Sequence, residues 1–231
     1  MKWLAAVVVL SGCDVIWRLD HVYPDSGSDR DDGGDVTGDG SNGGRPSFCT
    51  DAYVYDDMSS VEPCGTWGTR SGMLLQRNGA LEASANGSMI EFAGCSAEPY
   101  PALTEQGVFV EVTATIAGSD AYTELEVRNA VGAMPQMTAS LRYGGTLKFI
   151  VAGVVLHERP VAPAPRWWRI RAAGSFLIAE TALDAEPFAE FHSANVGLPS
   201  EIAVRFGVGV AAVGPTTGVT KVASFGICKA D

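Results

Sequence analysis

Short apolar segments separated by tight-turn dipeptides run through the chain from residue 47 onward. The dipeptides Asn78-Gly79 and Asn86-Gly87 are typical of type I′ turns, which join adjacent antiparallel strands. We therefore expect two consecutive hairpins here, formed by the three segments beside these turns. The glycine-containing residues 144–145 and 172–174 predict two further hairpins. A chain with so many tight reversals is expected to be built from strands.

Period-two alternation supports the same interpretation. In residues 108–116 (VFVEVTATI), valine, alanine and isoleucine share one face, while phenylalanine, glutamate and threonine share the other. The alternation recurs in residues 125–128 and 202–210, and no stretch has a long helical period. Hydrophobic residues make up 46% of the 231 residues, which is enough for a packed core, and the 27 glycines suit tight turns. The sequence therefore predicts an all-β fold, a two-sheet jelly-roll sandwich of about 12 to 14 antiparallel strands.

The amino terminus has the pattern of a bacterial lipoprotein export signal. Lys2 precedes the apolar run of residues 3–10 (WLAAVVVL), which is too short to span a bilayer. Residues 10–13 (LSGC) then match a lipobox, in which the cysteine is acylated and becomes the first residue of the mature chain. We expect a signal peptide over residues 1–12 and a lipid, including palmitate, on Cys13 that anchors the protein to a membrane. The alternative is a buried first strand that ends in an ordinary cysteine.

An acidic linker rich in glycine, aspartate and serine is predicted over residues 13–46. Residues 25–46 contain one aliphatic side chain, Val36, so they cannot bury enough apolar area to offset the cost of ordering the chain. The aspartates match a calcium-binding loop only in part, because Gly40 stands where the bidentate acidic ligand is required. We therefore expect a solvated spacer without metal, followed by one β-sandwich domain over residues 47–231.

Charge and motif content exclude several function classes. The net charge of -11 argues against binding to nucleic acid, which requires clustered lysine and arginine. No serine-hydrolase, P-loop, Rossmann or zinc-protease signature is present. His157 and His192 are isolated in the sequence, with no acidic partner at metal-ligand spacing. We therefore expect neither a cofactor nor a metal site.

The cysteine count fits an exported protein. Five cysteines are an odd number, but lipidation of Cys13 leaves an even set, namely Cys49, Cys64, Cys95 and Cys228. No CxxC pair is present and an exported compartment favours oxidation, so we expect disulfides in preference to zinc. Four cysteines allow three connectivities, and their positions alone leave the choice open.

Several segments resemble the concanavalin A-like lectin/glucanase sandwich. They are the opening segment AYVYDDM, the strand RWWRIR, the hairpin of residues 180–185 and a closing strand that carries Phe225. The stretch RWWRIRAAGSFLIAETALDAEPFAEF is similar to a segment of laminin G-like sandwich domains, although Phe188 replaces the usual tryptophan and Asp184-Ala185 the usual Asp-Gly. The resemblance covers residues 48–228 and implies the same sandwich fold.

The resemblance also implies a disulfide pairing. In sandwiches of this family the first and last strands run side by side, which implies that Cys49 pairs with Cys228 and leaves Cys64 to pair with Cys95. The family includes lectins and glucanases, so a glycan is the ligand class that the resemblance implies. Fold analogy alone is weak evidence for function.

Catalytic candidates come from the same resemblance. Laminarinase-type glycoside hydrolases carry three acids at alternating positions of one strand, and two carboxyl groups must lie close together for retaining hydrolysis. Alternation places Glu124, Glu126 and Arg128 on one strand face. Arg128 replaces the third acid and cannot protonate a leaving group, so Glu124 and Glu126 are the catalytic candidates. The alternative is an exposed strand with a Glu–Arg pair of little energetic weight.

A second candidate surface lies on the tryptophan- and arginine-rich strand. Alternation places Trp167, Arg169 and Arg171 on one face and Trp168 on the other. One tryptophan is expected in the core. The other either offers a flat apolar surface for sugars or covers the sheet, with arginine stems packed against it. Together with Arg128, these residues are the ligand-binding candidates.

The functional expectation is a membrane-anchored module at the bacterial cell envelope, on the periplasmic face or the outer surface of a membrane. We expect it to bind a glycan or an envelope component without catalysis. One alternative is a glycoside hydrolase-like enzyme, or a degenerate relative, that acts on β-glucans. The other is a purely structural envelope protein. The expected partners are the membrane, through Cys13, and the glycan or envelope protein, with no nucleic acid.

Overall fold

The computed structural model describes residues 45–85, 91–116, 120–130, 137–184, 187–210 and 218–229. All of them belong to the compact unit that begins at Ser41. The predicted signal peptide, the lipidation of Cys13 and the linker up to residue 44 lie outside the described residues. The described part of the chain contains no helix long and apolar enough to cross a membrane.

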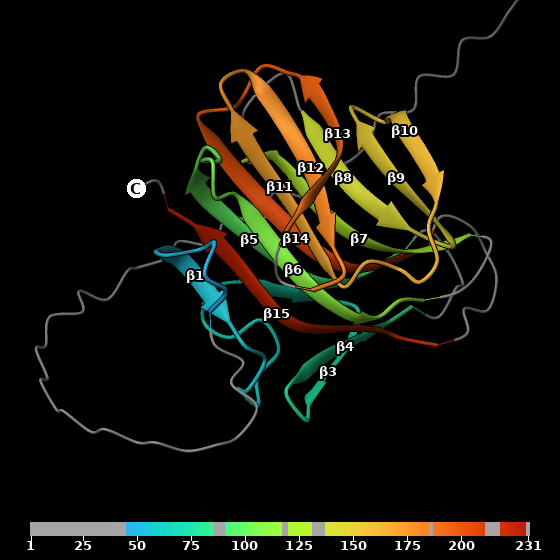
Figure 1. Cartoon of the computed structure of the whole chain (residues 1–231). Helices are drawn as coiled ribbons and strands as arrows, with labels where there is room; N and C mark the ends of the chain where they lie inside the picture. Colours follow the sequence, from blue (N-terminus) through green and yellow to red (C-terminus); the bar gives the residue numbers. More distant parts are fainter. Residues whose placement is uncertain are drawn as a thin grey trace, which may run out of the picture. The chain divides into compact units, whose positions relative to one another are not determined.

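The described residues form strands that assemble into two antiparallel sheets (Figure 1). The strands are β1 (Ala52–Asp56), β2 (Thr69–Ser71), β3 (Met73–Arg77), β4 (Ala80–Ser84), β5 (Glu91–Pro101), β6 (Val108–Ala114), β7 (Ala121–Asn129), β8 (Thr138–Tyr143), β9 (Thr146–Val151), β10 (Val154–Pro160), β11 (Trp167–Ala173), β12 (Phe176–Ala182), β13 (Ala189–Asn195), β14 (Glu201–Val210) and β15 (Thr220–Cys228). The eight-stranded sheet has the order β13-β12-β11-β6-β15-β4-β3, with β1 also paired to β15. The seven-stranded sheet has the order β10-β9-β8-β7-β14-β5-β2. The predicted all-β, two-sheet sandwich is therefore confirmed, with fifteen described strands.

The core lies between the sheets because each strand turns alternate side chains inward. From the seven-stranded sheet, Leu125 and Phe206 are fully buried, and from the eight-stranded sheet Trp168 and Phe225 are fully buried. The rings of Phe206 and Phe225 stack across the interface with centroids 4.4 Å apart. This packing consumes one face of each sheet, so any functional side chains must project from the two outer faces.

Three predicted hairpins are present. Asn78 and Gly79 have φ angles of 53° and 67°, as a type I′ turn requires, and they join β3 to β4. Residues 144–145 join β8 to β9, and residues 174–175 join β11 to β12. Turn dipeptides thus located these reversals correctly.

The hairpin predicted at Asn86-Gly87 is wrong in its pairing. β4 pairs with β3 and β15 in the eight-stranded sheet, whereas β5 pairs with β14 and β2 in the seven-stranded sheet. The turn itself lies outside the described residues. The physical reason is burial. Leu81 on β4 is buried as part of the eight-stranded sheet, and Ala93 on β5 is buried as part of the seven-stranded sheet. A turn dipeptide specifies a local reversal, but burial decides which sheet receives each strand.

Two disulfides connect Cys49 with Cys228 and Cys64 with Cys95, with Cα–Cα distances of 5.5 Å in both. This is the pairing that the family resemblance implied. β1 runs beside β15, and Ala52 is the register partner of Cys228, which brings the first bond together. Disulfides persist in oxidising compartments, so the domain is of the extracellular or envelope type.

Candidate functional site

The two glutamates of β7 project from the outer face of the seven-stranded sheet. Leu125 lies between them in the sequence, Val127 follows Glu126, and both of these apolar side chains are buried in the core. Period-two alternation therefore sends Glu124 and Glu126 to the opposite side of the strand. Despite this outward direction both glutamates are buried, because neighbouring side chains cover them.

Two arginines from neighbouring strands cover and pair these carboxylates. Arg142 is the register partner of Glu124 on β8, and its Nε donates to Oε1 of Glu124 at 2.5 Å. Arg205, from β14, is the register partner of Glu126. Its Nε lies 2.6 Å from Oε1 of Glu126, and its Nη2 donates to Oε2 at 2.9 Å. Both carboxylates are therefore held in direct ion pairs.

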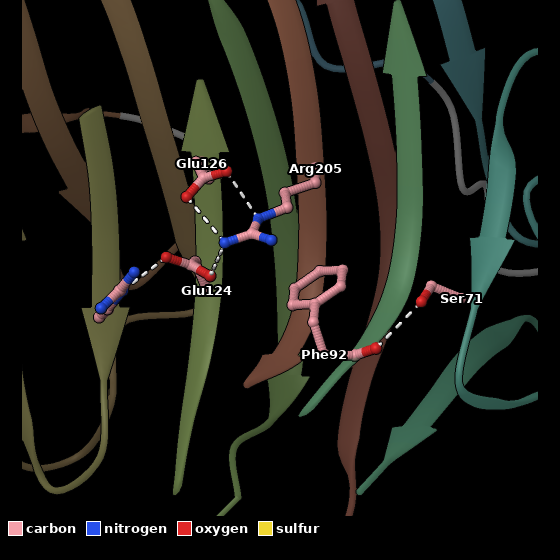
Figure 2. Close-up of polar contacts among 6 residues, drawn as sticks. Ser71, Phe92, Glu124, Glu126 and Arg205 are labelled. Atoms are coloured by element: carbon pink, nitrogen blue, oxygen red, sulfur yellow. Dashed lines mark hydrogen bonds and ion pairs between the residues drawn. The ribbon is translucent and has the colours of Figure 1, made fainter. Parts of the chain in front are cut away.

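Arg205 also links the two glutamates (Figure 2). Its Nη2 lies 3.4 Å from Oε2 of Glu124, so one guanidinium contacts both carboxylates. Figure 2 shows the Arg205 side chain reaching from β14 toward β7, with the ring of Phe92 beside it. The guanidinium carbon lies 4.5 Å from the centroid of the Phe92 ring, a cation–π distance. The arginine is thus fixed by charge on one side and by an aromatic ring on the other.

The protonation behaviour of the cluster follows from burial and charge. Burial, then the neighbouring charge of Glu124, raise the pKa of Glu126, and Arg205 opposes both effects without cancelling them. Burial by itself lowers the pKa of Arg142, but the charge and hydrogen bond of Glu124 outweigh it, so the pKa of Arg142 is raised. Arg142 therefore remains a cation at any physiological pH.

Tyr122 shares this outer face and borders the cluster. Its ring lies against the backbone of Gly209, where a Cβ atom would collide with the ring. The guanidinium of Arg142 lies 4.5 Å from the centroid of the Tyr122 ring. Burial raises the pKa of the Tyr122 hydroxyl, so it remains a neutral hydrogen-bonding group. Only glycine at position 209 permits this close packing.

A cavity of about 570 Å³ opens beside the glutamates over β7, β8 and β9. Its lining includes Tyr122, Ser140, Arg142, Thr146 and Lys148, together with the acidic Asp120 and the apolar Ile150 and Val155. The volume lies within the range of small-ligand sites, which are about 300 to 1,000 Å³. The cavity thus combines apolar surface with hydroxyl and charged groups.

No protein-family model matches the sequence, and no curated protein matches it. Among solved structures, a GlcNAcα1-4Gal-releasing endo-β-galactosidase from Clostridium perfringens superposes with a TM-score of 0.59 and 7% identity, over 78% of this chain and 62% of that enzyme. A laminarinase from Flavobacterium sp. UMI-01 gives a TM-score of 0.55 and 6% identity, over 77% of this chain and 100% of the laminarinase. The domain has the concanavalin A-like lectin/glucanase fold.

A further structure with this fold is the CBM2 module of an evolved Dit protein from Lactobacillus casei BL23 phage J-1. It gives a TM-score of 0.52 and 12% identity, over 76% of this chain and 94% of the module. All three identities are low, so they describe the concanavalin A-like fold and not a shared activity. This chain spans less than two thirds of the Clostridium perfringens enzyme.

The tryptophan- and arginine-rich strand lies on the other sheet of the concanavalin A-like sandwich. Trp168 is in the core, and its indole N–H donates to the carbonyl of Pro165 at 2.8 Å. Trp167 lies on the outer face of the eight-stranded sheet but is only 8% exposed, because it packs with Phe48 and Phe109. The structure therefore separates Trp167 from Glu124 and favours the covering role.

Arg169 and Arg171 accompany Trp167 on that face and share one acid. Their Nε atoms donate to Oε2 of Glu180 at 2.7 Å and 3.0 Å. Arg169 also lies 4.1 Å from the centroid of the Phe188 ring. The structure does not bring these two arginines together with the β7 glutamates. Arg128, by contrast, lies on β7 and is half-buried.

The two histidines that are isolated in the sequence meet in space. His157 on β10 and His192 on β13 stack with ring centroids 5.1 Å apart and planes 6° from parallel. They come from the edge strands of the two sheets, and only the tertiary fold brings them together. Within the described residues no group of three or more histidine, cysteine, aspartate or glutamate side chains is arranged to hold a metal.

Proposed function

We propose that the domain binds a glycan on the outer face of its seven-stranded sheet and does not cleave it. The observation that carries this proposal is the state of the β7 glutamates. Both are buried, and the two carboxylate oxygens of each glutamate contact Arg142 or Arg205. A hydrolase of this type requires one carboxyl group that delivers a proton and a second that reaches the sugar.

The arginines work against both roles. Arg205 contacts both oxygens of Glu126, so that carboxyl has no oxygen turned toward a leaving group without first breaking the pair. Arg142 and Arg205 contact both oxygens of Glu124 in the same way. The third position of the catalytic pattern is Arg128, whose guanidinium does not release a proton at neutral pH. The cluster is better suited to positioning than to proton transfer.

The cavity beside the cluster supplies what a bound sugar requires. Tyr122, Ser140 and Thr146 line it with hydroxyl groups, and Ile150 and Val155 line it with apolar surface. Sugars present hydroxyls at their edges and C–H groups on their faces, so both kinds of surface are needed. The solved structures with the same fold include an endo-β-galactosidase, a laminarinase and a CBM2 module, which supports a glycan as the ligand.

The test is a polysaccharide panel applied to the full chain. We expect retention of the protein on at least one immobilised glycan, with no release of reducing ends at high protein concentration. The Glu126→Gln variant keeps the shape of the side chain and is the catalytic control. Absence of retention on every glycan in the panel would contradict the proposal.

Hydrolysis is the second candidate function, and one observation favours it. Glu124 and Glu126 occupy adjacent outward positions of β7, and the pKa of Glu126 is raised, as a general acid requires. In that case Arg205 has to leave Glu126 when substrate binds. Release of reducing ends that disappears in Glu126→Gln would establish hydrolysis in place of simple binding.

Membrane display through Cys13 is a separate part of the proposal. The paired cysteines Cys49–Cys228 and Cys64–Cys95 support passage through an oxidising compartment, and they leave Cys13 outside both bonds. We expect mass spectrometry of the mature protein to show an acylated amino-terminal Cys13. Cys13→Ser should move the protein to the soluble fraction, and its retention in membranes would contradict lipid anchoring.

A further inference from the structure

Two cations face each other across a strand pair in the floor of the cavity. Arg142 on β8 and Lys148 on β9 are direct register partners, and both line the cavity. Directly opposed residues on an antiparallel pair have Cβ atoms about 5 Å apart, and like charges in this arrangement destabilise the sheet. A pair of adjacent cations therefore requires compensating negative charge.

The sheet supplies that charge at the two ends of the row, so the two cations lie side by side in its middle. Glu124 pairs with Arg142 on the β7 side, and Glu158 on β10 lies 3.2 Å from Lys148 on the other side. The register of four successive strands thus reads Glu124, Arg142, Lys148, Glu158. Glu124 contacts Arg142 at Nε, and a guanidinium has four further N–H groups. Arg142 and Lys148 line the cavity, whereas the two glutamates of the row do not, and Asp120 is the acid among the lining residues.

We propose that the cavity selects an acidic sugar, whose carboxylate or sulfate group lies between Arg142 and Lys148. This inference rests on the proposed glycan-binding function and specifies its ligand class. The next row of register partners contains Ser140, Ile150 and Val155. Ile150 and Val155 provide an apolar surface for the sugar ring. The hydroxyl groups of Ser140 and Thr146 are placed to bind the ring hydroxyls.

The flanking acids restrict which anions fit. Glu124 and Glu158 bound the cationic pair, and the whole chain carries a net charge of -11. This surrounding charge repels long polyanions, whereas a short acidic oligosaccharide places one of its anionic groups at the central position. The ligand class is therefore an acidic oligosaccharide and not a generic polyanion.

The experiment measures affinities of the full chain for defined oligosaccharides by calorimetry. The probes are oligomers of galacturonic, glucuronic and mannuronic acid, their methyl esters, sulfated galactan oligomers and the neutral counterparts. We expect tighter binding of an acidic member than of its neutral or esterified match. Preference for uronates or for sulfated oligomers then identifies the anionic group.

Charge variants locate the contact. Lys148→Gln should weaken binding of the acidic oligomer about tenfold, as expected for loss of one charge-assisted hydrogen bond, and leave neutral oligomers unaffected. Glu158→Gln removes the competing acid and should strengthen acidic binding. Lys221→Gln is the matched control, because Lys221 pairs with Glu82 at 2.8 Å on the other sheet and is 41% exposed, against 39% for Lys148.

The outcomes separate this inference from the proposed function. Equal affinity for acidic and neutral oligomers, or equal losses for both in Lys148→Gln, would overturn the inference and leave glycan binding intact. Loss of acidic binding in Lys221→Gln would also overturn it, because the contact would not be in the cavity. Absence of binding to every oligosaccharide would overturn the proposed function itself.

Discussion

Both outer faces of the sandwich carry a glutamate that binds two arginines, but only one of these faces is covered. On the seven-stranded sheet, Glu124 contacts Arg142 and Arg205 beside an open cavity. On the eight-stranded sheet, Glu180 contacts Arg169 and Arg171. There the rings of Phe48 and Phe188 and the Cys49–Cys228 bond lie over the strands. The same ion-pair chemistry thus lies beneath aromatic rings on one face and beside a cavity of about 570 Å³ on the other.

The two faces differ in the side chains that lie over them and not in the types of residue that they carry. Trp167 and Arg169 have the composition expected of a sugar-binding platform, yet Phe48 packs on both. The segment that carries Phe48 is held at this position by the disulfide of the next residue, Cys49. No comparable segment lies over the cavity among the described residues. Stability and ligand affinity are therefore expected to depend on different faces.

The largest expected effect comes from removing the covalent attachment of the covering segment. Cys49→Ser combined with Cys228→Ser opens a bond that spans 179 residues of sequence. Because the unfolded chain gains freedom, we expect the free energy of unfolding to fall by roughly 3 to 5 kcal/mol. Urea unfolding followed by tryptophan fluorescence measures the change. Glycan binding by the still-folded variant should persist, and its loss would mean that the two faces are not independent.

Breaking the two matched glutamate clusters should have the next largest effect. We expect Glu124→Ala and Glu180→Ala each to lower the free energy of unfolding by about 3 kcal/mol, because each leaves two arginines with less compensating charge. The cost should be higher for Glu180, since Arg169 is 13% exposed and Arg142 is 29% exposed. Chemical unfolding in low and high salt compares them. A smaller loss for Glu180→Ala would contradict the importance of cover.

The pH dependence of stability should differ in sign between the faces. The pKa of Glu126 is raised in the folded state, so its stabilising contribution is present below the ordinary value of 4.5 and is lost as pH rises through the folded pKa. The pKa of Glu82 is lowered by hydrogen bonds from Lys221 and Arg77, so its contribution is present above 4.5 and is lost as pH falls.

Unfolding of Glu126→Gln and Glu82→Gln between pH 3 and pH 8 tests this contrast, with about 0.5 pH steps as the sampling. Relative to the parent protein, Glu126→Gln should gain stability as pH rises, and Glu82→Gln should lose it. Glu82 lies on β4 of the eight-stranded sheet and is the more solvated group, so its effect should be the smaller one. Parallel trends in the two variants would refute the contrast.

Sequence patterns predicted the two-sheet sandwich and most of its local reversals because alternation and turn chemistry are local properties. They also placed Glu124 and Glu126 on one strand face. They did not identify Arg142 and Arg205, which reach Glu124 across 18 and 81 residues of sequence, because strand register brings these residues together. The alternating residues 202–210 do place Arg205 outward, which is the one local signal for it. The burial of Trp167 depends on Phe48, whose position is set by a disulfide and not by any pattern near the tryptophan.

The smallest expected effect is the loss of single hydroxyl groups from the two faces. Thr146→Val removes a hydroxyl that lines the cavity, and Thr113→Val removes one on the outer face of the eight-stranded sheet, where it donates to the carbonyl of Lys221 at 3.4 Å. Both variants keep the branched shape that suits a strand, so each should change the free energy of unfolding by less than about 0.5 kcal/mol. Glycan affinity should fall about fivefold in Thr146→Val, since one neutral hydrogen bond contributes about 1 kcal/mol. Calorimetric titration of both variants with the same oligosaccharide measures this difference, and an equal loss in Thr113→Val would show that the loss is not specific to the cavity.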